Sequence, residues 1–417
     1  MNNGSTELQN TVRQLMDTHG VSVETGFLAE RPLRWLLKDT GRIQQVKDFE
    51  QLDAMAYALE QTISERQVAE SVERLDVPCW SFEDLPWPVV YRLMLIYAMC
   101  THAYFREVYP YGNVSELMQD QRPKTLPAQL AVPLWRASRR IGMEPTMSYG
   151  LYALWNYYRK DPEKPVSVEN IELIHSFTGT PDERWFVRIH QAVEAAFAPA
   201  IPELLTACLL SRGYDPDGPM PSPRRFEDNV IVEEMIHCLE NATKAAQDAV
   251  VVLKRMREHC DYGTYFNQVR LFFTFPNSVV FNGVEELAGI PQQKLGETGG
   301  QTPFMHFQLA AAGIDHDDDP YFPRMRHYMS KPFRDLIEFV KQTSKIRSFV
   351  LERRHNDQLV RAYNALIQAV PLDWRFVHMR LVEDFIGRFG ESHGTGKPPL
   401  DWLSALHKKA TSYLITL

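Results

Sequence analysis

The sequence predicts an all-α protein in which a smaller, mostly helical domain precedes a large helical domain. The 417 residues are 44% hydrophobic, which is enough to bury a large core. After about residue 126, long segments carry apolar residues at the spacing of a buried helical face. A proline-punctuated segment, QRPKTLPAQLAVP, separates these segments from the first part of the chain. We therefore expect a small domain over 1–125 and a large domain over 126–417.

The small domain mixes short helical stretches with turn-forming clusters. Three prolines in VPCWSFEDLPWP, at 78, 86 and 88, are expected to interrupt any regular element there. In the large domain, helical periodicity predicts seven segments. Pro371 is expected to divide the last one into two helices, because proline clashes with the preceding turn. The segments cover about 133–159, 167–176, 182–212, 226–259, 302–313, 332–353 and 356–388.

Composition argues against several classes of function. Lys and Arg total 45 against 53 Asp and Glu, so the formal net charge is −8 and no overall basic field attracts nucleic acid or an anionic membrane. The first residues, MNNGSTELQNTVRQLM, lack the apolar core of a signal peptide, and no run of about 18 apolar residues occurs. We expect a cytoplasmic protein with no nucleic-acid or membrane partner.

The cysteines are odd in number, far apart and never in a CxxC pair. This pattern indicates neither a disulfide framework nor a zinc site, so we expect buried thiols. They are Cys79, Cys100, Cys208, Cys238 and Cys260.

His378 is the most informative residue, because it lies on the apolar stripe of an amphipathic helix expected from Leu372 to about Arg388. A buried imidazole must satisfy both nitrogens, since an unpaired buried polar group costs roughly 1–3 kcal/mol. A hydrogen bond to a backbone carbonyl and a bond to a metal both meet this need. The stripe consists of Trp374, Val377, His378, Leu381, Val382 and Phe385.

Two further residues are candidates for a binding site. His190 lies on a second apolar stripe, between Phe186 and Phe197, and two such histidines on separate helices could flank one planar cofactor. His190 could equally be a structural core residue. Arg270, in YFNQVRLFFTF, keeps its charge among aromatic residues and needs a carboxylate or phosphate partner. That partner could be a ligand or an internal Asp or Glu.

The segment GETGGQTPFMHF, residues 296–307, joins a glycine-rich turn to an apolar helical run. Small residues there let the backbone approach a ligand closely and leave N–H groups available to it, although a plain loop has the same composition. The segment is not a GxxxxGK[ST] motif, and no GxGxxG follows a strand, so nucleotide binding has little support.

Taken in order from about 121 to 400, the chain resembles the indoleamine 2,3-dioxygenase family, and we expect a bacterial member. The family consists of haem enzymes that open the indole ring of tryptophan with dioxygen. The resemblance therefore implies that the large domain binds haem b and its iron, with O2 as co-substrate. It is carried by RPKTLPAQLAVPLW, YALWNYYRKDPEKPVSVENIELIHSF, YFNQVRLFF, GETGGQTPF and RAYNALIQAVPLDWRFVHMRLVEDFI.

The resemblance also implies roles for residues near the cofactor. His378 matches the proximal iron ligand, and Arg375 matches an arginine near a haem propionate, with a surface salt bridge as its alternative role. His190 stands where indoleamine dioxygenases often carry serine. It resembles instead the distal histidine of tryptophan 2,3-dioxygenases, which bonds the indole nitrogen, so His190 could orient the substrate or accept its proton. Arg270 matches the arginine that holds the substrate carboxylate.

The remaining matches concern the substrate pocket and the loop beside haem and substrate. HGTGKPP resembles the family's GTGGT loop only over its first residues, which include Thr395, and Lys397 and Pro398 replace the next two. The matching positions are Tyr149, Tyr152, Ala153, Phe186, Tyr265, Phe266, Thr298, Gly299, Gly300 and Thr395.

These implications together predict a haem-dependent dioxygenase that inserts O2 across the indole C2–C3 bond of L-tryptophan or a related indole. The product would be of the N-formylkynurenine type, with His190 and Arg270 as catalytic residues. The electron donor that reduces the iron is unidentified, and the oligomeric state is not predicted. One alternative is a haem enzyme that catalyses another oxidation or a rearrangement of a tryptophan derivative. Another is a non-catalytic haem sensor or carrier, against which Arg270 argues because a carrier needs no carboxylate anchor.

Overall fold

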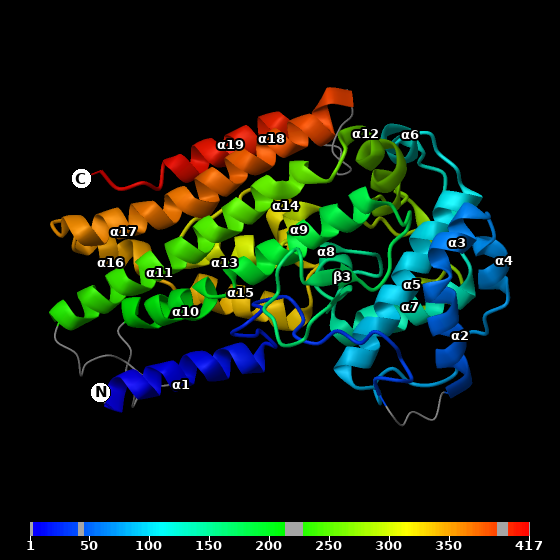
Figure 1. Ribbon diagram of the computed structural model, residues 1–417, viewed down its shortest axis with the longest axis horizontal. Coiled ribbons are helices and arrows are strands. Elements are labelled where there is room, and N and C mark those ends of the chain that lie inside the picture. The colour runs from blue at the N-terminus through cyan, green and yellow to red at the C-terminus, as the bar shows by residue number, and fades with distance from the viewer. Residues whose placement is uncertain (1–2, 41–45, 213–227, 390–398, 417) are drawn as a thin grey trace.

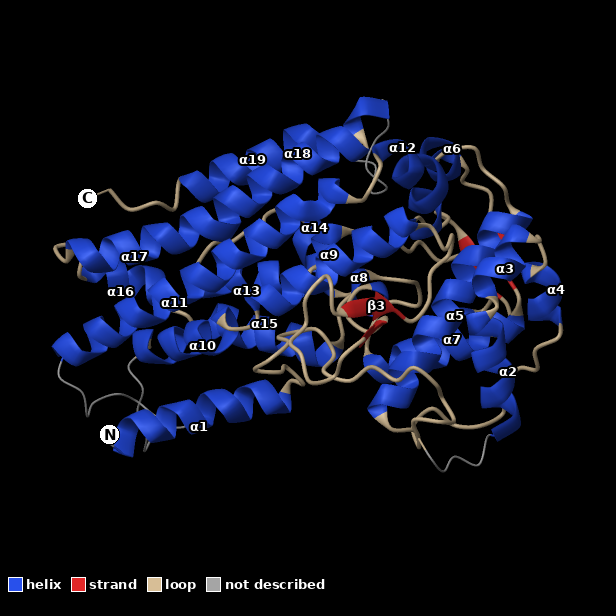
Figure 2. Cartoon of the chain, in the orientation of Figure 1, coloured by secondary structure: helices blue, strands red, loops and turns tan. Residues whose placement is uncertain are grey.

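The computed structural model, which describes residues 3–40, 46–212, 228–389 and 399–416, confirms the all-α class. Most of the chain is helical, and within these ranges the strands are three residues long and form two-stranded sheets (Figure 2). One sheet pairs β1 (Lys124–Leu126) in parallel with β4 (Val279–Phe281). The other pairs β2 (Tyr157–Arg159) with β3 (Ile171–Leu173) in antiparallel register.

The long helix α11 (Asp228–Lys254) is the centre of the helical bundle (Figure 1). It packs against α9 (Pro181–Phe197), α10 (Ala200–Ser211), α17 (Asp357–Ile367) and α18 (Arg375–Phe385). Small buried side chains allow these close helix contacts. The helices α9 and α18, which carry His190 and His378, are thus held by a common neighbour. The small residues of α11 are Ala242, Ala245, Ala246 and Ala249.

The first part of the chain contains a long buried helix, α5 (Trp87–Val108), which packs on α7 (Ala128–Ile141). The expectation that prolines interrupt every regular element there is wrong at this helix. Pro86 and Pro88 lie at its start, where the backbone N–H groups have no intrahelical partner and proline is tolerated.

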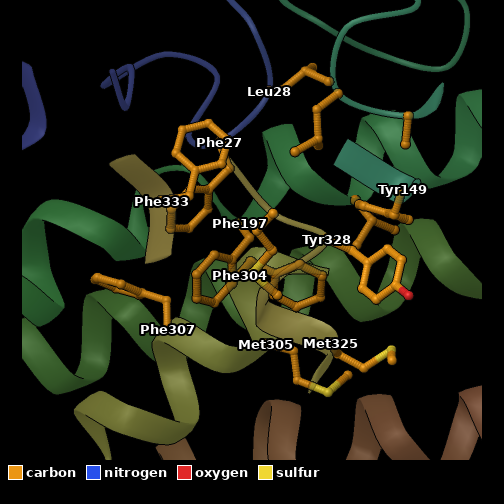
Figure 3. Packing of buried hydrophobic residues seen from close by; sticks show 14 of the residues in the cluster. Phe27, Leu28, Tyr149, Phe197, Phe304, Met305, Phe307, Met325, Tyr328 and Phe333 are labelled. Atoms are coloured by element: carbon orange, nitrogen blue, oxygen red, sulfur yellow. The ribbon is translucent and has the colours of Figure 1, made fainter. Parts of the chain in front are cut away.

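The amino-terminal helix α1 (Asn3–Thr18) packs against α10 in the bundle, away from α2 to α7 (Figure 1). Aromatic packing also connects the beginning of the chain to the core (Figure 3). The ring of Phe27 meets the rings of Phe307 and Phe333 edge-on, with centroid distances of 5.8 and 5.1 Å. The domain boundary near residue 125 stays a prediction.

The helix predicted over 133–159 is wrong in part, and the helix predicted over 167–176 is absent. Helix α7 ends at Gly142, whose φ of 73° is left-handed, and the chain continues through the single turn α8 (Tyr149–Tyr152) into β2. Residues 167–176 contain β3. The Asn170 side-chain amide donates to the carbonyls of Asp161, Lys164 and Pro165 at 3.0–3.1 Å and fixes the loop before this strand.

Two other predicted helices are each divided in the structure. Residues 182–212 form α9 and α10, which bend by 41° beside Pro199. No single helix in the described ranges is long and apolar enough to cross a membrane, and only this bent pair meets that test of length and composition when the two are joined. Residues 332–353 form α15 (Lys331–Thr343) and α16 (Ile346–Glu352).

The expectation that Pro371 divides the segment 356–388 into two helices is confirmed in part, because α17 and α18 are separate α-helices on either side of it. A π-helical segment, Gln368–Trp374, contains Pro371 and joins α17 to α18 without a break. The wider π turn tolerates the missing N–H and relieves the clash of the ring with the preceding turn. The segments predicted over 226–259 and 302–313 are confirmed as α11 and α13 (Pro303–Ala311).

All five cysteines are free, and four are buried as expected, but Cys79 is exposed because its irregular, proline-flanked segment lies outside the core. Helix α19 was not predicted; it packs on α18 (Figure 1). The remaining α-helices are α2 (Val46–Tyr57), α3 (Leu59–Ser64), α4 (Val68–Glu73), α6 (Val114–Gln119), α12 (Tyr262–Thr264), α14 (Tyr321–Arg326) and α19 (Pro399–Thr411).

Candidate functional site

A cavity of about 920 Å³ opens between α9, α18 and the glycine-rich turn after Leu295. Its wall is mainly apolar and aromatic, with a few polar groups. The polar residues are His190, Arg270, Thr274, Glu297, Thr298 and His378, and the apolar ones include Phe186, Leu253, Met256, Tyr265, Phe273, Leu381, Val382, Phe385 and Ile386.

Helix α9 presents His190 to this cavity in a defined protonation state. The side chain of Thr180 caps the helix by accepting from the backbone N–H of Glu183 at 3.2 Å. One turn before His190, the carbonyl of Phe186 accepts from His190 Nδ1 at 2.8 Å. A carbonyl can only accept, so Nδ1 carries the proton and Nε2 is the acceptor. Burial lowers the pKa of His190 to about 4, so the imidazole is neutral at pH 7.

Helix α18 presents His378 to the same cavity. The His378 ring is half-buried and stacks on Trp374, with centroids 5.0 Å apart and an interplanar angle of 15°. Gly299 lies opposite, where an added Cβ would be 3.5 Å from His378 Nε2. The backbone of Gly299, which has no side chain, therefore lies close to this nitrogen.

One turn before His378, Arg375 is 1% exposed. No described residue provides a hydrogen-bond partner for its Nη1 or Nη2. Burial lowers the pKa of Arg375 to about 10. Its side chain lines a second cavity of about 520 Å³, which shares Thr298, Gly299 and His378 with the first. An unpaired buried guanidinium is costly, so this position suits an anionic ligand group.

The glycine-rich turn packs directly on the segment that contains Arg270. A Cβ at Gly296 would overlap the carbonyl oxygen of Phe273, which also accepts from the Glu297 backbone N–H at 2.9 Å. Arg270 begins the 3₁₀ turn Arg270–Phe273 and is itself buried. The turn and the arginine are therefore fixed side by side in the cavity wall.

Gly300 also has a packing reason for its lack of a side chain. A Cβ there would overlap the hydroxyl group of Tyr321. Gly300 and Tyr321 both line the second cavity, together with Arg375.

Several residues selected from the sequence lie outside the wall of the main cavity. Tyr149, Tyr152 and Ala153 form a buried layer behind it: the Tyr149 ring is 5.8 Å from that of His190, and Tyr152 is 5.2 Å from Phe273. Phe266 stacks on Phe389 at 4.1 Å, with the Arg270 guanidinium 5.3 Å from its ring. Thr395 lies outside the described residues.

The cavity wall also contains residues that sequence reasoning missed. Glu297 could have been noticed as an acidic residue within the glycine-rich turn. Phe273 was visible only as part of an aromatic run, and Leu253 and Met256 lie on α11 and the turn that follows it, which carried no polar signal.

The fold and the cavity define an all-helical protein with a site faced by two histidines from separate helices, which suits a planar cofactor. Comparison with known proteins specifies the class further. The model of the family described as indoleamine 2,3-dioxygenase matches residues 15–396. The chain belongs to the indoleamine 2,3-dioxygenase family and is an oxidoreductase of the tryptophan/indole dioxygenase type, as the sequence resemblance predicted.

The relatives differ in the substrates that their names state. Indoleamine 2,3-dioxygenase 1 of Mus musculus is 26% identical over 387 residues, which cover 90% of this chain and 85% of the relative. The protein of the same name from Rattus norvegicus has the same identity and coverage. The 6-hydroxytryptophan 2,3-dioxygenase of Fusarium equiseti is 27% identical over 271 residues, which cover 63% of this chain and 62% of the relative. Membership of the family therefore leaves the particular indole open.

Proposed function

We propose that this protein is a haem-dependent dioxygenase that adds both atoms of O2 across the C2–C3 bond of L-tryptophan or a close indole amino acid. The product would be of the N-formylkynurenine type. The observation that carries this proposal is that His190, His378 and Arg270 face one aromatic cavity from three different elements.

The residues around the cavity fit haem b. His378 would be the iron ligand, and the backbone of Gly299, which has no side chain, lies close to its Nε2. The guanidinium of Arg375, whose Nη1 and Nη2 have no partner among the described residues, would pair with a propionate. When bound, the haem iron supplies the binding and activation of O2.

The protein's own residues would bind and orient the substrate. Phe186 and Tyr265, whose ring centroids are 4.5 Å apart, would provide an aromatic surface for the indole. Arg270 would hold the substrate carboxylate through a bidentate contact. The neutral His190 would accept a hydrogen bond at Nε2 from the indole N–H. Apolar residues of α18 would keep water from the reacting atoms.

We place the enzyme in the cytoplasm and in a kynurenine-type pathway of tryptophan breakdown. The net charge of −8 supports a protein that binds neither nucleic acid nor an anionic membrane surface. An electron donor would keep the iron reduced.

The test is to load purified protein with haem, reduce it, and follow L-tryptophan in air by absorption and product mass. We expect a histidine-ligated haem spectrum and a product that has gained both oxygen atoms. His378→Ala should lose this spectrum, whereas His355→Ala, at an exposed position, should not change it. A product with one added oxygen atom or none would support another oxidation or a rearrangement. Haem binding with no consumption of any indole would support a carrier, and absence of haem binding would refute the proposal.

A further inference from the structure

Glu297 is an acidic residue in the wall of the main cavity for which the proposed reaction so far has no use. Within the described chain, its carboxylate makes no hydrogen bond to a side chain or backbone group, and no ion pair joins it to Arg270. The side chain is only partly covered because it faces the cavity. A carboxylate in such a place needs a partner, and the described residues do not provide one.

The backbone places Glu297 next to the carboxylate anchor. The Glu297 N–H donates to the carbonyl of Phe273, and Arg270 is three residues before Phe273 in the same short 3₁₀ turn. A guanidinium and a carboxyl group therefore enter one cavity from adjacent segments. Tyr265, which interacts electrostatically with both, contributes to the aromatic wall between α9 and this region.

We propose that Glu297 binds the α-ammonium group of the substrate and thereby makes the pocket selective for zwitterionic indole amino acids. The inference rests on the proposed function. A free amino acid presents a carboxylate and an ammonium group on one carbon atom, and Arg270 and Glu297 provide the complementary pair of charges. An indole acid that lacks the amine would fill the aromatic wall and contact Arg270 but would leave the Glu297 carboxylate without a partner.

The electrostatics of the protein groups around Glu297 support this role. Burial raises the pKa of Glu297 to about 8, so the surroundings disfavour its charged form. The tyrosines that interact with Glu297 cannot compensate for its charge, because a phenol is never a cation, and burial raises the pKa of each so that it stays neutral. They are Tyr149, Tyr152, Tyr265 and Tyr321. A cationic substrate group would provide the missing compensation.

The test measures equilibrium binding to the ferric, haem-loaded protein by the change in its absorption spectrum, so that it does not depend on turnover. The ligands are L-tryptophan, indole-3-propionate, which lacks the amine, and 6-hydroxytryptophan. Glu297→Gln should raise the Kd of L-tryptophan about 10- to 100-fold, the usual effect of losing a charged hydrogen bond, and should leave that of indole-3-propionate within about twofold. Glu297→Asp, which keeps the charge, should retain part of the preference for tryptophan. The matched control is Glu286→Gln, at an exposed position near the same turn, which should change neither affinity.

Three results would overturn the inference. Equal weakening of tryptophan and indole-3-propionate by Glu297→Gln would show a merely structural role. A change confined to 6-hydroxytryptophan would assign Glu297 to the indole ring and not to the amine. If the wild-type protein binds haem but no indole, the proposed function fails, and the inference fails with it. In the first two cases, binding of tryptophan by the wild-type protein would show that the inference alone is refuted.

Discussion

Replacing Arg375 with methionine should stabilise the haem-free protein and weaken its binding of haem. The lowering of the Arg375 pKa from its ordinary value of 12.5 to about 10 corresponds to roughly 3 kcal/mol against the charged guanidinium in the empty protein. Methionine has a similar length and no charge, so it removes this cost and keeps much of the packing. In the haem-bound protein, however, a propionate would lose its cationic partner.

The assay is urea unfolding of the haem-free protein together with haem titration. We expect the free energy of unfolding to rise by about 1–3 kcal/mol and the affinity for haem to fall about 10- to 100-fold. Arg380→Met, at an exposed position on the same helix, should change stability by no more than about 0.5 kcal/mol. A haem-free Arg375→Met protein that is less stable than the wild type would show that the guanidinium already has a partner. An unchanged haem affinity would refute the propionate contact.

Three further perturbations test other parts of the site. Gly300→Ala should lower the free energy of unfolding in urea by about 1–3 kcal/mol and lower the haem content, because its Cβ would overlap the Tyr321 hydroxyl. Adding Tyr321→Phe to this variant should restore part of the stability. If it restores none, the overlap is not the cause. The affinity for tryptophan should rise from pH 6 to 8.5, because Glu297, with its pKa of about 8, becomes charged over this range. Over the same range His190, Tyr265 and Tyr321 stay neutral, and the guanidinium of Arg270 stays charged. If tryptophan affinity rises equally with pH in the Glu297→Gln variant, the pH dependence belongs to another group. Glu183→Gln should destabilise the protein by about 2–4 kcal/mol, because the buried carboxylate accepts from the backbone N–H groups of Phe177 and Thr178 at 2.7 Å. The control is Glu233→Gln, at an exposed position. An effect of Glu183→Gln no larger than that of the control would refute this reasoning.

Helical periodicity predicted the elements that keep apolar residues at helical spacing along their length. Helix α11 does so while it packs against several neighbouring helices, and its predicted range was close to the observed one. The pattern failed over 167–176, where Asn170 bonds to three loop carbonyls and the chain forms a strand. Such side-chain bonds to distant backbone groups compete with local helix formation and leave no periodic trace in the sequence.

The same distinction applies to the site. His190 and His378 could be selected from the sequence because each is a polar residue on an otherwise apolar stripe. Phe385 carried no such signal, since a phenylalanine on a stripe is ordinary core, and only the approach of α18 to the cavity places it in the wall. Glu297 carries no signal of a binding role in the sequence, because charged residues within glycine-rich turns are common at protein surfaces. Its importance comes from the packing of Gly296 on Phe273, which a single sequence does not reveal.

The polar groups of the two cavities have a physical property in common. Arg375 is buried with two nitrogen atoms unpartnered in the described chain, and Glu297 faces the main cavity with a raised pKa. When the protein folds without ligands, burying Arg375 and Glu297 lowers its stability, and apolar residues at these positions would avoid that loss. The charged forms of Arg375 and Glu297 have opposite signs, and the two side chains lie in adjoining cavities. A single charged ligand group therefore cannot compensate both. A bound anion beside Arg375 and a bound cation beside Glu297 would compensate them separately, which is what a haem propionate and a substrate ammonium group would do.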